Sequence, residues 1–143
     1  MKTVKDVLEA KGGQVLTVTA GGTVYEALEL MAANNVGALV VVEGDKMVGI
    51  VSERDYARKV ILRGASSLKL RVRSIMSKDV CCTHSQMTVD ECMALITEMR
   101  CRHLPVIDDD DLVGLVSIGD LVKATLEEKE LLINQLKTYI TSG

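Results

Sequence analysis

The sequence predicts an α+β fold in which two β-α-β-β-α repeats pack together with pseudo-two-fold symmetry. Three observations lead to this prediction. When the chain is shifted by 65 residues, residues 15–56 align on residues 80–121 without a gap, and 12 of the 42 aligned pairs are identical. Each copy alternates short apolar runs with helical patterns. One copy of about 60 residues is too small to bury a sufficient core alone, so we expect the two copies to share one.

The first copy shows its elements in a clear order. A short strand is expected over residues 15–18, followed by a turn at Gly21 and Gly22. Thr23 and Glu26 form a capping box, which predicts a helix that begins there. Two apolar strands are expected at residues 38–42 and 47–51 around a polar turn, and a helix is expected from Ser52 to about Leu62.

The second copy repeats this order. Thr88 and Glu91 form the matching capping box, strands are expected at residues 103–107 and 112–116, and the last helix runs from Ser117 to about Tyr139. A short helical lead-in precedes each copy, with Val4, Val7 and Leu8 in the places of Val72, Ile75 and Met76. We therefore predict domains at residues 1–64 and 65–143, joined by a short polar linker at residues 64–69.

The composition excludes several classes of protein. Hydrophobic residues make up 48% of the 143 residues but aromatic residues only 2%, so the core is aliphatic and functions that depend on aromatic stacking are disfavoured. The longest apolar run, residues 36–42, is far shorter than the roughly 20 residues of a membrane span. No secretion signal or transit peptide is recognisable, and we expect a cytoplasmic protein.

Charge and cysteine usage exclude further classes. The net charge of −3 gives the whole molecule no attraction to nucleic acid. All four cysteines lie within residues 81–101, whereas a disulfide framework would be spread along the chain, so we expect reduced thiols. Their spacing is not that of a zinc site, and Cys92 and Cys101 fall on core positions. We expect neither a metal site nor thiol catalysis.

Two strings of eight residues resemble the signature that closes a CBS domain, in which glycine precedes two apolar residues, Ser or Thr, two variable residues and Asp. These are Val48-Gly49-Ile50-Val51-Ser52-Glu53-Arg54-Asp55 and Val113-Gly114-Leu115-Val116-Ser117-Ile118-Gly119-Asp120. Two such domains in tandem form a CBS pair, or Bateman module, and the resemblance covers all of the chain except the end of the last helix.

The resemblance implies a regulatory module and not an enzyme. Such a module binds an adenine nucleotide in clefts between its halves, with AMP as the leading ligand and ADP, ATP or NAD as other candidates. It commonly assembles as a homodimer and controls a partner protein, which the sequence does not identify. The alternative is a dimerisation or interaction module whose clefts bind nothing.

The paired residues Ser52 with Asp55, and Ser117 with Asp120, have two interpretations. Each pair is a capping box that starts a helix. Each pair is also a candidate ligand site, because the free N–H groups of a helix N-terminus attract phosphate. A carboxylate there would repel phosphate, so Asp55 and Asp120 are expected to accept hydrogen bonds from the two ribose hydroxyls, as the family resemblance also implies. The serine hydroxyls are free to reach phosphate or ribose.

The resemblance adds further residues to the predicted ligand site. Because CBS pairs exchange contacts between halves, Arg102 and His103 are expected to serve the Asp55 site, and Gly37 and Ala38 the Asp120 site. We expect the Asp55 site to hold more phosphate charge, and the Asp120 site to grip mainly the nucleoside. The other expected contacts come from the signature positions and from the backbone that precedes each first strand (residues 11–15 and 78–80), namely Arg54, Gly119, Val15 and Val80.

Two segments have a structural and a functional interpretation. Seven basic residues between Arg54 and Arg73 form either a solvated face with a linker or a surface for anions, including nucleic acid. The last helix keeps an apolar side over five turns, which either packs on its own domain or contacts a second subunit. That side consists of Val122, Leu126, Ile133, Leu136 and Ile140.

Overall fold

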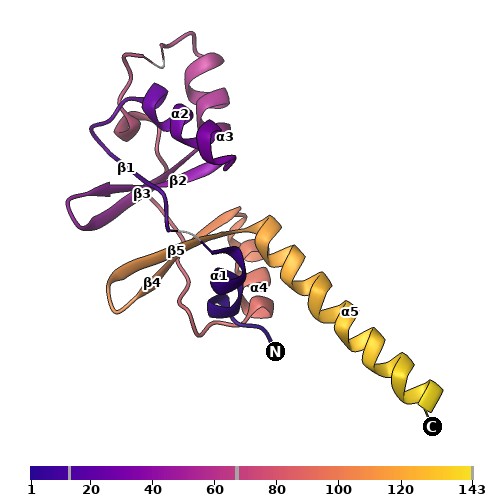
Figure 1. Cartoon of the computed structure of the whole chain (residues 1–143). Helices are drawn as coiled ribbons and strands as arrows, with labels where there is room; N and C mark the ends of the chain where they lie inside the picture. The colour runs from indigo at the N-terminus through magenta and orange to yellow at the C-terminus, as the bar shows by residue number, and fades with distance from the viewer. Residues whose placement is uncertain (13, 67, 143) are drawn as a thin grey trace. The chain divides into compact units, whose positions relative to one another are not determined.

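The computed structural model of the chain describes residues 1–12, 14–66 and 68–142 (Figure 1). The chain forms two compact units, one of residues 15–80 and the other of residues 1–14 together with residues 81–143. The elements are α1 (Val4–Lys11), β1 (Thr17–Thr19), α2 (Val24–Asn34), β2 (Ala38–Glu43), β3 (Lys46–Ser52), α3 (Glu53–Tyr56), a π-helical turn η1 (Ala57–Ile61), a 3-10 turn η2 (Val72–Ser74), α4 (Val89–Met99), β4 (His103–Asp108), β5 (Asp111–Ser117) and α5 (Ile118–Ser142).

The unit of residues 15–80 contains a three-stranded sheet. Its order is β1-β2-β3, with β1 parallel to β2 and β2 antiparallel to β3. Leu39, Val41 and Val51 of the sheet are buried, and they pack with the apolar side of α2, including Val24 and Met31. The predicted alternation of strands and helices in the first copy is confirmed, with aliphatic side chains filling the core.

The other unit contains the antiparallel hairpin of β4 and β5 together with α1, α4 and the first turns of α5. Where the sequence predicts a first strand for this copy, the described residues form only a single parallel bridge, between Thr83 and Val106. In the first copy the N–H of Val40 donates to the carbonyl of Leu16. Pro105 stands in the place of Val40 and has no N–H, so the corresponding ladder bond cannot form.

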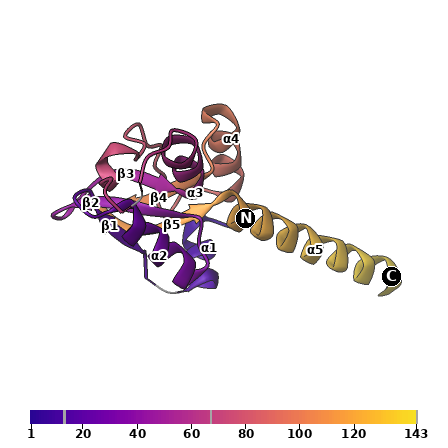
Figure 2. The same cartoon turned by 90° about the horizontal axis from the view of Figure 1, so that it is seen from above.

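The predicted helix starts are confirmed at α2 and α4. Thr23 accepts a hydrogen bond from the N–H of Glu26, and Thr88 accepts one from the N–H of Glu91. The helix expected after Ser52 is confirmed in part, since α3 ends after one turn and continues as the π-helical turn η1. Helix α5 is longer than expected and extends away from the rest of its own unit (Figures 1 and 2).

The boundaries of the two compact units differ from the predicted domain boundary between residues 64 and 65, because each lead-in segment belongs to the unit of the other copy. Helix α1 belongs to the unit of the second copy, and the segment with η2 belongs to the unit of the first. A Cβ atom on Gly114 would lie 2.6 Å from Cδ2 of Leu8, and one on Gly49 would lie 2.6 Å from the carbonyl oxygen of Ser77. Each signature glycine therefore leaves room for the lead-in of the other copy, which is why the compact units exchange these segments.

Candidate functional site

Asp120 lies at the start of α5, within a network of short hydrogen bonds. Its Oδ2 atom accepts from the N–H of Ser117 at 2.9 Å, and its own N–H donates to Oγ of Ser117 at 3.1 Å. The Nζ atom of Lys11, from the last turn of α1, lies 2.9 Å from the same Oδ2 and donates to the carbonyl of Leu115 at 2.9 Å. The capping interpretation of this pair is thus confirmed, and a lysine is added to it.

The Asp120 carboxylate stays ionised, and one of its oxygens has no hydrogen bond from the described residues. Burial raises the pKa of Asp120, but hydrogen bonds from the Ser117 N–H and from Lys11, with the charge of Lys11, outweigh burial and place this pKa below its ordinary value. Within the described residues no hydrogen bond reaches Oδ1, and a quarter of the side chain is exposed. An ionised carboxylate whose second oxygen has no partner can accept a hydrogen bond from a hydroxyl group.

A cleft of about 280 Å³ lies beside Asp120, between α1 and α5. Its volume is just below the range of about 300 to 1,000 Å³ that is typical of small-molecule pockets. The apolar part of its wall comes from Val7, Ala10 and Ala124. Its charged groups are mixed in sign, three cationic and three anionic, namely Lys2, Lys11, Lys123, Asp6, Asp120 and Glu127. This mixture suits a ligand with both hydroxyl and anionic groups better than a purely apolar one.

Asp55 occupies the matching position in the other unit but is more fully engaged. Its Oδ2 atom accepts from the N–H and the hydroxyl of Ser52 at 2.9 and 3.1 Å, and its N–H donates to that hydroxyl at 3.2 Å. Its Oδ1 atom lies 3.1 Å from Nζ of Lys59, which also donates to the carbonyl of Ile75 at 2.8 Å. Only 13% of the Asp55 side chain is exposed. A ligand that binds this carboxylate must displace Lys59.

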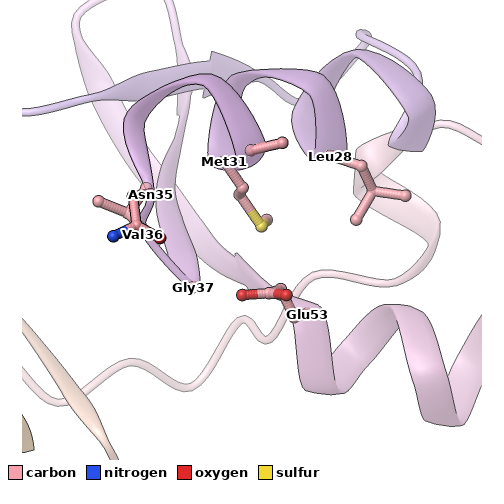
Figure 3. A pocket seen from close by; sticks show the side chains of 7 residues that line it. Leu28, Met31, Asn35, Val36, Gly37 and Glu53 are labelled. Carbon is pink, nitrogen blue, oxygen red and sulfur yellow. The ribbon is translucent and has the colours of Figure 1, made fainter.

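A second cleft, of about 220 Å³, lies in the same unit as Asp55, between α2 and the start of α3 (Figure 3). Leu28 and Met31 form an apolar wall, and Glu53 lies across from them. The N–H of Glu53 donates to the carbonyl of Gly37 at 3.0 Å, and a Cβ atom on Gly37 would lie 3.1 Å from Oε1 of Glu53. Since Glu53 is its one charged side chain, this cleft suits a neutral group with N–H donors and not a phosphate.

The structure places several of the predicted site residues at equivalent positions in the two units. Ala38 pairs across from Ser52 in the first copy, and His103 pairs across from Ser117 in the second. Gly37 and Arg102 also hold equivalent places, since the Arg102 carbonyl accepts from the N–H of Ile118 as that of Gly37 does from Glu53. The predicted exchange of these residues between the two sites stays a prediction. The side chains of Arg54 and Arg102 are exposed, as is Gly119, while Val15 and Val80 are half-buried.

The charges of Lys11 and Asp120 act on the pKa of His103. Burial lowers the pKa of His103, the nearby charges of Lys11 and Arg102 lower it further, and the charge of Asp120 opposes them. The pKa of His103 is therefore below its ordinary value. A neutral imidazole beside the Lys11–Asp120 pair can donate one hydrogen bond and accept another.

The basic stretch from Arg54 to Arg73 serves in part to hold its own unit together. Besides Lys59, Arg71 donates to the carbonyl of Gly21 at 3.1 Å and Arg73 to that of Ala20 at 3.4 Å. These bonds fix the turn that follows β1. These three residues thus have a structural role within their own unit that neither interpretation of the stretch had named. The predicted linker includes residue 67, and the predicted contact segment 11–15 includes residue 13, and these two residues lie outside the described ones.

Two lysines that pair with the predicted aspartates were not among the predicted side-chain contacts. Lys59 stands four residues after Asp55, a spacing that places two side chains on one face of a helix, so the sequence carried a signal for this pair. Lys11 is 109 residues from Asp120, and its place in the repeat is held by Asp79 in the other copy. No local pattern could have indicated it.

The two cysteines that the sequence places on core positions pack as predicted. Cys92 is fully buried in the core, and Cys101 packs against that core. Across residues 1–12, 14–66 and 68–142, no group of three His, Cys, Asp or Glu side chains is placed to hold a metal ion. The helices of the same residues include none that is both long and apolar enough to cross a membrane.

Comparison with known proteins identifies the family. The CBS domain is matched by residues 4–62 and again by residues 72–127. The chain is 41% identical to the mitochondrial CBS domain-containing protein CBSX3 of Arabidopsis thaliana, with 99% of this chain and 73% of that protein covered. The structure of a CBS-domain protein from Burkholderia ambifaria matches with a TM-score of 0.84 and 50% identity, over 88% of this chain and 95% of that one.

A third relative was solved with ligands bound. The CBS domain pair of protein MJ0100, in complex with 5′-methylthioadenosine and S-adenosyl-L-methionine, matches with a TM-score of 0.79 and 25% identity, over 90% of this chain and 98% of that one. The doubled signature, the folds of the two units and these likenesses agree. The chain belongs to the CBS domain family and consists of a CBS domain pair.

Proposed function

We propose that this CBS pair is a regulatory module that binds an adenine nucleotide, with AMP as the preferred ligand over ADP, ATP or NAD, and holds its ribose hydroxyls at Asp120 and Asp55. The observation that carries the proposal is the geometry of Asp120. Its carboxylate is ionised, is fixed by the N–H of Ser117 and by Lys11, and lines a cleft, and within the described residues no hydrogen bond reaches its Oδ1. A fixed carboxylate with a free oxygen is suited to accept a ribose hydroxyl.

The two aspartates are proposed to bind with different strength. At Asp120 a hydroxyl can approach Oδ1 while Lys11 stays in place. At Asp55 both oxygens already have partners, so the ligand must first displace the Nζ atom of Lys59 from Oδ1. Losing that ion pair offsets part of the gain from binding. We therefore expect the Asp120 site to bind the nucleoside more tightly.

A relative supports the adenosine class of ligand, and the positions of the tyrosines limit how an adenine base could be held. Both ligands of the MJ0100 CBS pair contain adenosine. Of the three tyrosines, Tyr56 packs against the core of its unit and Tyr139 is exposed far along α5. Tyr25 is 45% exposed on α2. An adenine base bound away from Tyr25 would be held by aliphatic side chains and backbone hydrogen bonds rather than by ring stacking.

The remaining parts of the proposal concern assembly and context. We propose that the chain acts as a homodimer and controls a partner protein according to nucleotide occupancy. It performs no catalysis of its own in this proposal. A cytoplasmic location stays a prediction, and the Arabidopsis relative CBSX3 is mitochondrial.

A thermal-shift panel tests the ligand class. The ligands are AMP, ADP, ATP, NAD, NADH, S-adenosylmethionine and 5′-methylthioadenosine, each measured at low and high salt. A ligand at 100 times its dissociation constant stabilises the folded state by about 2.7 kcal/mol. We expect AMP to give the largest shift at equal concentration. No shift with any compound would contradict the proposal.

The alternative function is an interaction module whose clefts bind no nucleotide. The observation that favours it is the full engagement of Asp55, whose capping box and ion pair explain that residue without any ligand. This alternative predicts a flat thermal-shift panel together with unchanged self-association. Binding to nucleic acid through the basic stretch would instead show an affinity that collapses steeply with salt and ignores ribose chemistry.

A further inference from the structure

The distal part of α5 carries an exposed apolar seam with a seven-residue repeat. Every residue from 129 to 141 is exposed, so the interpretation that this part packs on its own domain is wrong. Counting Leu126 as the first position of a heptad, the first and fourth positions are Leu126, Lys129, Ile133, Leu136 and Ile140. The four apolar members are between 51% and 75% exposed. This spacing is the sequence pattern of a two-stranded coiled coil, in which a partner helix covers the seam.

We propose that the partner is the same segment of a second copy of this chain, running antiparallel. The proposal rests on the proposed homodimer and assigns its contact surface and orientation. In a parallel pair the two Lys129 side chains would face each other across the axis, and like charges at that position are unfavourable. In an antiparallel pair each Lys129 faces Ile140 of the second copy, near the helix end, where its ammonium group can reach water.

Charge complementarity selects the antiparallel arrangement. The positions that flank the seam on one side are Glu130 and Lys137, and in an antiparallel pair residues of this side face each other. When Ile133 packs opposite Leu136 of the second copy, Glu130 lies beside Lys137 of that copy, and the contact occurs twice by symmetry. In a parallel pair the same two residues would face Thr125 and Leu132, and neither would find an opposite charge.

The same side chains select one register. A shift of one heptad toward the N-termini would place Leu126 opposite Leu136 of the second copy. It would also set Glu130 against Glu130 and Lys123 against Lys137, which are like charges. The favoured register pairs residues 127–142 of the two copies, an overlap of roughly 24 Å at the rise of an α-helix. On the other flank, Leu132 then packs beside Tyr139 of the second copy.

Sedimentation equilibrium of the full chain and four variants tests the proposal. Ile133→Asp together with Leu136→Asp is expected to raise the dimer dissociation constant by about a thousandfold or more, because four charges would enter the seam. Leu131→Asp is the matched control. Leu131 is 59% exposed, similar to Ile133 at 51%, but it lies on the opposite side of the helix, so no change is expected.

The orientation is tested by reversing charges. Glu130→Lys is expected to weaken the dimer roughly tenfold, because two attractive pairs become repulsive, and adding Lys137→Glu is expected to restore it. A parallel pair predicts no such rescue. The absence of rescue in the double variant would therefore overturn the antiparallel orientation. A dimer that persists in the double aspartate variant would overturn the seam but not the proposed homodimer. A wild-type chain that is monomeric at every concentration would overturn both.

Discussion

The Nζ atom of Lys11 lies 2.9 Å from Oδ2 of Asp120, although 109 residues separate them in the sequence. The matching aspartate of the first copy, Asp55, takes its lysine from position 59, and the place of Lys59 in the second copy is held by Ala124. Two aspartates that are equivalent in the repeat thus form ion pairs with lysines whose positions in the repeat are not equivalent. The cation at Asp120 ties α1 to the start of α5, whereas the one at Asp55 stays within its own helical segment.

Replacing Lys11 with Met is expected to destabilise the fold by about 1 kcal/mol, because the variant loses bonds to Asp120 and to the carbonyl of Leu115 in a partly exposed setting. Denaturant unfolding measures the loss. Lys2→Met is the control, since Lys2 forms only an exposed pair with Glu127 at 3.2 Å and should cost a few tenths of a kcal/mol. Equal losses in the two variants would contradict a special role for Lys11.

The two signature glycines are expected to differ in their tolerance of alanine. A Cβ atom at position 49 would meet backbone, the Ser77 carbonyl that accepts from the N–H of Ile50, whereas at position 114 it would meet the flexible end of Leu8. Gly49→Ala should therefore cost about 2 to 3 kcal/mol and Gly114→Ala about 1 kcal/mol. Adding Leu8→Ala to Gly114→Ala should remove the clash, and the double variant should cost less than the sum of the single ones.

Denaturant unfolding measures the loss of stability in Gly49→Ala and Gly114→Ala. Equal losses in these two variants would show that contact with the lead-in segments does not determine how well each glycine tolerates alanine. Full additivity of Leu8→Ala and Gly114→Ala would contradict the packing of Leu8 on Gly114.

His103 is expected to make stability fall as the pH is lowered below neutrality. Burial and the charges of Lys11 and Arg102 lower the pKa of His103 in the folded state, while Asp120 opposes them. The unfolded chain, with a histidine pKa of about 6.5, then binds the proton more readily. Between about pH 6.5 and the lower folded-state pKa, protonation favours unfolding, and stability is recovered as the pH rises.

Thermal or denaturant unfolding between pH 7.5 and 5.5 checks this expectation, because few carboxylates titrate there. His103→Gln should flatten the decline relative to the wild-type chain. An identical decline in His103→Gln and the wild-type chain would rule out His103 as its source.

The fold was predictable from the sequence wherever local chemistry and the repeat determine it. The side-chain caps of Thr23 and Thr88 set the helix starts, and the apolar runs set strands β2 to β5. The sequence shows Pro105 at the place of Val40. That this proline removes a bond of the first strand becomes clear only from the hydrogen bond that the Val40 N–H donates to the Leu16 carbonyl in the first copy. The exchange of lead-in segments depends on close packing at two glycines, which repeat alignment alone does not reveal.

The candidate site was predictable in its signature residues and not in its cations. The Ser117–Asp120 pair forms the capping box that the spacing indicates. Lys11 escaped prediction because its partner is distant in sequence and its equivalent in the repeat, Asp79, has the opposite charge. Only the packing of α1 on the second copy brings this lysine to the carboxylate.

Calorimetric titration with AMP and with 2′-deoxy-AMP tests the central claim, the role of the aspartates as ribose acceptors, most directly. The proteins are the wild-type chain, Asp55→Asn, Asp120→Asn and Glu91→Gln. Asparagine retains an acceptor for the backbone N–H of the capping serine but loses the negative charge. Glu91 occupies the same capping position in α4 and serves as the control.

A hydrogen bond to a charged acceptor contributes about 1.5 to 3 kcal/mol, so the wild-type chain should bind AMP at least roughly tenfold more tightly than the deoxy analogue. Asp120→Asn should lose most of this preference, Asp55→Asn a smaller part, and Glu91→Gln none. AMP affinity and ribose preference that remain unchanged in both aspartate variants would contradict the account.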